Sequence, residues 1–191
     1  MDDAIPFAGR EYFILLAILV FSRGADFLST WVATPHLLLE GNPIAKWLGW
    51  KWGAAVNGIL VLSLAMWPLS AIIVSTASVL VAARNFQSAW LMRSMGELAY
   101  RDWYVQRVAE TRITLYLVCL AGNTLLTAGV GTALIAFSAT FNYVLIVPTG
   151  IGMGIIAYAM AVLIFTLLSV WRSRRKNPTL PRLPDLDNPQ L

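Results

Sequence analysis

The sequence predicts an all-α protein, a polytopic membrane bundle of four transmembrane helices with one amphipathic helix on its cytoplasmic side. The chain has 191 residues, of which 58% are hydrophobic and 13% are charged, and its mean hydropathy is +0.68. Soluble domains carry about 25% charged residues. The length of the chain fits roughly four or five spans of about twenty residues each, with their connections. The basic residues flank these runs and form no stripe, so they predict membrane topology and no nucleic-acid binding.

The first span is expected at residues 12–33, where the four-span membrane domain of residues 12–171 begins. Residues 1–11 form an amino terminus with two aspartates, which disfavours a cleaved secretory signal. The apolar run in this span is short, and the helix is completed only by including Arg23 and Asp26. Each of these charges costs roughly 2.5 to 3.5 kcal/mol at the membrane centre, which nearly cancels the apolar gain. The span should therefore depend on other helices and turn its polar side inward.

The second span is expected at residues 54–76, after a loop whose tryptophans are typical of a membrane boundary. The apolar pattern persists to Ala83, and Pro68 is the expected place for a kink in one long helix. Residues 84–112 then alternate arginines with acidic residues and repeat apolar residues at helical spacing, which predicts the amphipathic cytoplasmic helix. Within it, Glu97 and Arg101 have the spacing of an ion pair.

The third and fourth spans are expected at residues 113–137 and 143–171, joined by a short turn. The fourth span contains Gly150 and Gly154, whose spacing is typical of close helix packing. Residues 172–191 form a basic and then proline-rich cytoplasmic tail, and its proline-rich part, residues 177–191, cannot hold a regular helix.

The distribution of charge predicts the orientation in the cell membrane. The amino terminus, the 84–112 segment and the tail carry one, five and five Lys or Arg residues, whereas the loop after the first span has only Lys46 and Lys51. The positive-inside rule then predicts that both termini are cytoplasmic and that the loop faces outward.

The first span carries a polar face with two interpretations. On a helix, Ser22, Asp26 and Ser29 fall on one line, with Arg23 and Thr30 beside it. In the functional interpretation, Asp26 is a proton, cation or head-group site that faces a wet cavity. In the structural interpretation, Arg23 and Asp26 form a buried pair that holds the register of the bundle.

A second polar group follows at residues 40–43. Asn42 suits the N-cap of a short helix that begins at Pro43, so helix capping explains both residues without a function. Capping does not explain Glu40. If the loop folds back, Glu40 and His36 could converge with Asp26 as an acid–base pair or a metal site. The only histidine is His36, and motifs such as HExxH and GxSxG are missing from the sequence, so we expect neither a metal nor a cofactor.

The order Asp26, Ser29, Thr30, Glu40, Asn42 and Pro43 resembles the DUF5658 family of small multi-spanning membrane proteins of unknown function. The resemblance covers about twenty residues, and it implies the candidate site more than an activity. The long arginine-rich segment departs from the simple four-span plan of that family.

These observations predict a non-enzymatic membrane protein, acting as an accessory, assembly or small binding subunit with ligand or ion candidates on the first helix. Its partners would be the bilayer and other membrane-protein subunits or a second copy. Two alternatives remain open. One is a proton- or cation-binding transporter or channel subunit, and the other is a membrane enzyme that acts on lipid or peptide through Asp26 and Glu40.

Overall fold

The computed structural model describes residues 3–140 and 145–176, which form six α-helices and no strand. The helices are α1 (Arg10–Ala33), α2 (Pro43–Leu64), α3 (Pro68–Met95), α4 (Glu97–Glu110), α5 (Ile113–Ala139) and α6 (Ile146–Lys176). Four of them, α1, α3, α5 and α6, are long and apolar enough to cross a membrane. The prediction of an all-helical chain with four helices able to cross a membrane is thus confirmed. The predicted tail beyond residue 176 and part of the turn before α6 lie outside the described residues.

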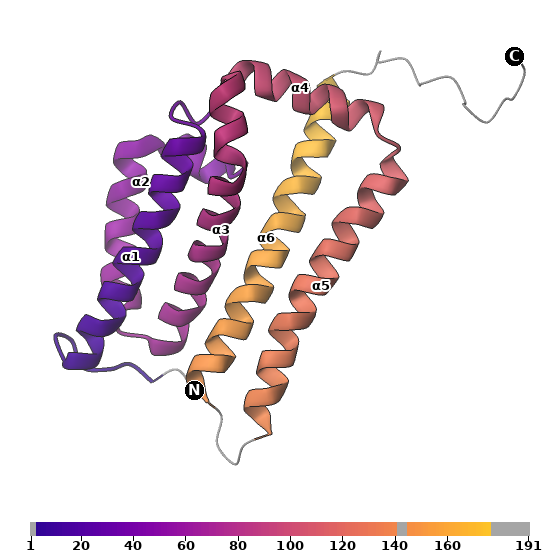
Figure 1. Ribbon diagram of the computed structural model, residues 1–191. Coiled ribbons are helices and arrows are strands. Elements are labelled where there is room, and N and C mark those ends of the chain that lie inside the picture. The colour runs from indigo at the N-terminus through magenta and orange to yellow at the C-terminus, as the bar shows by residue number, and fades with distance from the viewer. Residues whose placement is uncertain (1–2, 141–144, 177–191) are drawn as a thin grey trace, which may run out of the picture.

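Helix α3 is the centre of the bundle, with α1 on one side and α6 on another (Figure 1). Small residues recur at spacings of three, four or seven positions along α3 and are buried there: Ala71, Ser75, Ser78, Ala82 and Ala89. The buried face of α1 includes Ser22 and Ser29, which are 1% and 0% exposed. Small side chains let two backbones approach closely, and this is the common basis of helix association in membranes.

Glycines allow α6 to pack closely against both α3 and α5. A Cβ on Gly154 would lie 2.7 Å from the carbonyl oxygen of Ile73 in α3. A Cβ on Gly152 would lie 2.5 Å from the carbonyl oxygen of Gly131 in α5. Alternate glycines of α6 therefore serve two different neighbours, and Gly150, which faces Ile72, extends the contact with α3.

The predicted second span is wrong in its extent, because the chain reverses direction within it. Helix α2 ends at Leu64, and α3 begins at Pro68 and runs antiparallel to it (Figure 1). A proline disfavours the helical conformation of the preceding residue, and Trp67 is extended, with φ −121° and ψ 94°. Ala65, which is fully buried, fills the turn. Pro68 thus starts a new helix where a kink in one helix was expected.

This reversal also changes which segments share an end of the bundle. The predicted outward loop and the predicted cytoplasmic segment lie together, because Thr34, His36 and Leu38 all contact Glu97 at the start of α4. In Figure 1, α1 begins at the end of the bundle opposite to the end where α6 finishes. The start of α1 and the end of α6, as far as they are described, therefore lie at opposite ends of the bundle.

The predicted amphipathic helix is shorter than the 84–112 segment. Its first part belongs to α3, which ends at Met95 before Gly96 with φ 79°. Such a positive φ suits glycine and stops the helix. Helix α4 then crosses the end of the bundle from α3 to α5 (Figure 1). The predicted pair of Glu97 with Arg101 is wrong, since Arg101 contacts Asp102 and Glu97 turns to the loop.

Candidate functional site

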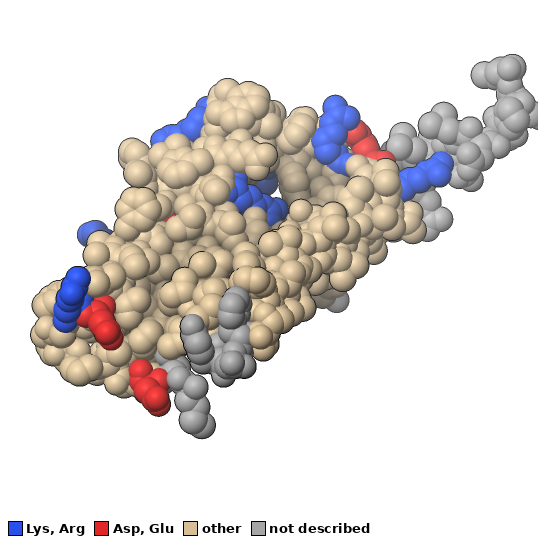
Figure 2. All heavy atoms as spheres, turned by 60° about the horizontal axis from the view of Figure 1, so that its bottom comes forward, with Lys and Arg blue, Asp and Glu red and all other residues tan. Residues whose placement is uncertain are grey.

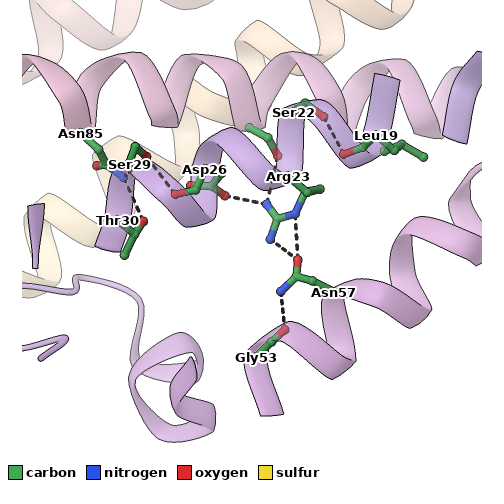
Figure 3. A network of polar contacts seen from close by, with 10 residues as sticks. Leu19, Ser22, Arg23, Asp26, Ser29, Thr30, Gly53, Asn57 and Asn85 are labelled. Atoms are coloured by element: carbon green, nitrogen blue, oxygen red, sulfur yellow. Dashed lines mark hydrogen bonds and ion pairs between the residues drawn. The ribbon is translucent and has the colours of Figure 1, made fainter. Parts of the chain in front are cut away.

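Arg23 is the centre of a polar network that joins three helices (Figure 3). Its Nη1 lies 2.7 Å from Oδ2 of Asp26, one turn further along α1. The same Nη1 donates to the Ser78 hydroxyl of α3 at 3.0 Å. Nε donates to Oδ1 of Asn57 in α2 at 2.8 Å, and Nη2 donates to the same oxygen. A planar guanidinium with five donors suits such a junction, because it satisfies several acceptors in fixed directions.

Asn57 is oriented by its own helix. Its amide nitrogen donates to the carbonyl oxygen of Gly53 at 2.8 Å, so its side-chain oxygen is directed at Arg23 (Figure 3). Gly53 is buried, and a Cβ there would contact the ring of Phe27 of α1 at 3.6 Å. The close approach of α2 to α1 thus brings the amide within reach of the guanidinium.

A second cluster lies one to two turns further along α1. The side-chain nitrogen of Asn85 donates to Ser29 at 3.2 Å and to Thr30 at 3.1 Å (Figure 3). The Ser29 hydroxyl in turn donates to the backbone oxygen of Asp26 at 2.9 Å. Ser29 and Thr30 therefore act as acceptors for α3. Sequence reasoning missed both Asn85 and Ser78, although their seven-residue spacing on one helix was a usable signal.

A third polar centre is Glu97, which also was not identified as a site residue from the sequence. Its Oε2 accepts from the Thr34 hydroxyl at 3.0 Å and from the Leu38 amide at 3.2 Å. Its Oε1 accepts from the His36 amide at 3.0 Å and lies 3.2 Å from the His36 ring. The Glu97 side chain is only 9% exposed. One carboxylate thus holds the loop after α1 against the start of α4.

The remaining predicted site residues organise the same loop. Asn42 caps α2 through a bond from the Ile44 amide at 3.0 Å, and Pro43 is the first residue of that helix. Oε1 of Glu40 accepts from the Asn42 amide at 2.7 Å. The charge of Glu40 acts on Asp26, so the two carboxylates are within electrostatic range. His36 is not part of that pair, because its side chain is 79% exposed and contacts Glu97.

The described side chains offer few groups that are free to bind a ligand or to transfer a proton. Asp26 is 16% exposed and one of its oxygens is bound to Arg23, so its charge is largely committed within the bundle. In the part of the chain that the structure describes, no group of three or more His, Cys, Asp or Glu residues is placed to hold a metal ion. The predicted convergence of His36 with Asp26 and Glu40 does not occur.

The contact between Glu97 and the loop is expected to weaken in acid. Burial would raise the pKa of the Glu97 carboxyl, but the hydrogen bonds that it accepts hold its pKa below the ordinary value of 4.5. Docking of the loop then favours the deprotonated form, so its stability is present above pH 4.5 and is lost as the pH falls through the lowered pKa. We expect the protection of the His36 and Leu38 amides from hydrogen exchange, corrected for intrinsic rates, to fall in that range.

Two variants separate this effect from general acid unfolding. Glu97→Gln has one acceptor oxygen in place of two, so protection of the loop amides should already be about tenfold lower at pH 7. Glu110→Gln is the matched control, since Glu110 pairs with Arg107 on the exposed side of α4 and does not touch the loop. Equal protection in Glu97→Gln and in the unchanged protein would contradict the assignment.

Comparison of this chain with family models, curated proteins and solved structures found no match. The resemblance to the DUF5658 family therefore stays a prediction, based on the residues from Asp26 to Pro43. The function of the chain must accordingly be inferred from the geometry of its described residues.

Proposed function

We propose that this chain is a non-enzymatic integral membrane protein, an accessory, assembly or binding subunit, with Arg23 and Asp26 as its architectural centre. The observation that carries the proposal is that one guanidinium bonds acceptors from α1, α2 and α3 at once. If Arg23 exchanged these partners for a ligand, the contacts between the three helices would be lost and the bundle would be less stable. Exposed apolar side chains along α5, such as Leu125 and Leu126, suit contacts with lipid or with other membrane helices.

The enzyme alternative receives no support from this geometry. Acid–base catalysis needs the acting groups within hydrogen-bond reach of one reacting position. His36 is turned toward Glu97, and Glu40 is bound to the backbone of its own loop. These contacts make His36 and Glu40 groups that order the loop, while Asp26 is paired with Arg23 within α1.

A proton- or cation-binding role is the second candidate. Two features favour it: only Oδ2 of Asp26 is bonded among the described residues, and the Glu40 carboxylate is within electrostatic range. A cation near both carboxylates would relieve their repulsion. This role would make Asp26 the essential residue.

Flux measurements on the protein in lipid vesicles distinguish the two roles. Under the architectural proposal, vesicles with the unchanged protein and with Asp26→Asn give the same proton and cation flux, while the variant is less stable. Glu110→Gln is the control for loss of one negative charge on the exposed part of α4. A flux that is present in the unchanged protein and in Glu110→Gln, but lost in Asp26→Asn, would replace the architectural role with the transport role.

We also propose an orientation in the cell membrane that revises the one expected from the sequence. The end of the bundle with α4 has a concentration of basic residues: Lys46, Lys51, Arg93, Arg101, Arg107, Arg112 and the start of the basic run at Arg172. The opposite end has Arg10, together with Asp3 and Glu11. The positive-inside rule then places the α4 end in the cytoplasm and the start of α1 outside.

This orientation requires α2 to return across the membrane as a fifth, shorter crossing. The expected result is that a fluorescent protein fused after residue 191 folds in the cytoplasm, while a reporter active only outside the cell works when fused before residue 1. The same two reporters exchanged between the ends are the control and should both be silent. Cytoplasmic location of both ends would contradict the proposal and restore the arrangement expected from the sequence.

A further inference from the structure

A cavity of about 620 Å³ lies between α3, α5 and α6, apart from the Arg23 network. It is lined by Leu80, Ala83, Arg84, Gln87, Asn123 and Tyr158. Helices α3 and α6 pack closely nearer the start of α3, where Gly150 and Gly154 of α6 contact it. Figure 2 shows a hollow on this face of the molecule with Lys or Arg atoms inside it, which agrees with a lining that contains Arg84.

Arg84 has no partner for its charge within the described part of the chain. Four ion pairs occur among those residues, and none of them involves Arg84. The Arg84 guanidinium is within electrostatic range of Tyr100 and Tyr104, so it lies on the side of the cavity that faces α4. An arginine on a membrane-spanning helix is costly without a partner for its charge, so an anion in the cavity would be favoured.

The other polar groups of the cavity also lack partners. Gln87 and Asn123 are exposed and Tyr158 is half-buried, and none of these three side chains makes a hydrogen bond among the described residues, so their polar groups are open to a ligand. Arg84 is eleven residues before the end of α3 at Met95, which is about 16 Å along the axis. Asn123 is ten residues after the start of α5 at Ile113, about 15 Å along. The two residues therefore lie at similar depth, and three different helices direct polar groups to one place.

We propose that this cavity binds the phosphate group of an anionic lipid, with Arg84 as the charge partner and Gln87, Asn123 and Tyr158 as hydrogen-bonding groups. A guanidinium binds phosphate through two parallel hydrogen bonds. Leu80 and Ala83 add an apolar part to the lining, which suits the glycerol and first acyl carbons of a lipid. The cavity lies in the half of the bundle nearer the α4 end, where basic residues concentrate. In the orientation proposed above this is the cytoplasmic half, and basic pockets between helices on that side bind anionic head groups. Lipid binding there does not depend on the role of the Arg23 and Asp26 centre.

The test uses the full chain, purified in a neutral detergent, with phosphatidylglycerol and phosphatidylcholine as probes. Bound lipid is counted by native mass spectrometry, and the midpoint of thermal unfolding is followed on titration. We expect phosphatidylglycerol to bind and to raise the midpoint, and phosphatidylcholine to do so far less. In Arg84→Gln, affinity for phosphatidylglycerol should fall fivefold or more, the loss of roughly one lysine or arginine contact with an anionic lipid surface.

Arg101→Gln is the matched control, because Arg101 is exposed on α4 and its partner is the neighbouring Asp102. Its affinity for phosphatidylglycerol should equal that of the unchanged protein. If Arg84→Gln does not fold, Tyr158→Phe replaces it, with an expected two- to tenfold loss for one hydrogen bond. The proposal is overturned if the variant of the cavity binds phosphatidylglycerol as the unchanged protein does, or if phosphatidylcholine binds equally well. If inorganic phosphate alone raised the midpoint of thermal unfolding as much as phosphatidylglycerol does, the ligand would be free phosphate and the lipid proposal would be wrong.

Discussion

Replacement of Arg23 with methionine is expected to lower the free energy of unfolding by about 3 to 5 kcal/mol. Methionine keeps much of the side-chain volume but removes every donor of the network. The Asp26 carboxylate then stays buried without a charge partner, and Asn57 and Ser78 lose their bonds to α1. Reversible unfolding in mixed micelles of a mild and a denaturing detergent, followed by circular dichroism, measures the change.

Arg101→Met is the matched control for this substitution. The Arg101 side chain is 51% exposed and pairs with an exposed neighbour, so its loss should cost less than about 1 kcal/mol. The double variant Arg23→Met with Asp26→Asn should be more stable than Arg23→Met alone, because it removes the unpaired charge. If Arg23→Met and Arg101→Met were equally stable, the network would not hold the three helices together.

The polar face of the first helix could be predicted from the sequence because it depends on local spacing. Arg23, Asp26 and Ser29 were expected to turn inward, and the structure agrees, with α2 and α3 supplying their partners. The cap of α2 by Asn42 is equally local and follows from the Asn-Pro pair. In both cases a few consecutive residues carry the whole signal.

Features that depend on distant contacts were missed. The turn before Pro68 interrupts a run that is apolar on both sides, so hydropathy alone cannot separate one long span from two antiparallel helices. The bond between Glu97 and Thr34 joins residues 63 positions apart. The orientation expected from the sequence assumed one span there, and the revised orientation that we propose follows from this turn. Gly96 was a usable local signal for the end of α3.

The contact between α5 and α6 yields a second large effect, in which two glycines of one helix respond in opposite ways to alanine. A Cβ on Gly131 would lie 2.5 Å from the carbonyl oxygen of Gly152 and 2.9 Å from Ile156 Cγ1. Since a backbone oxygen cannot move aside alone, Gly131→Ala must push the two helices apart. We expect a loss of about 1 to 3 kcal/mol in the free energy of unfolding, measured in the same micelles.

Gly129→Ala is the control, because a Cβ there meets nothing within 4 Å and the position lies on the same helix, two residues away. Alanine favours a helix over glycine by about 0.8 to 1.0 kcal/mol, so this variant should be as stable as the unchanged protein or more stable. Helix propensity changes equally in the two variants, so it cannot make the change in the free energy of unfolding differ in sign between them. The close approach of α6 to Gly131 is then the cause. Equal stability of the two variants would mean that α5 and α6 do not pack through these glycines in the membrane.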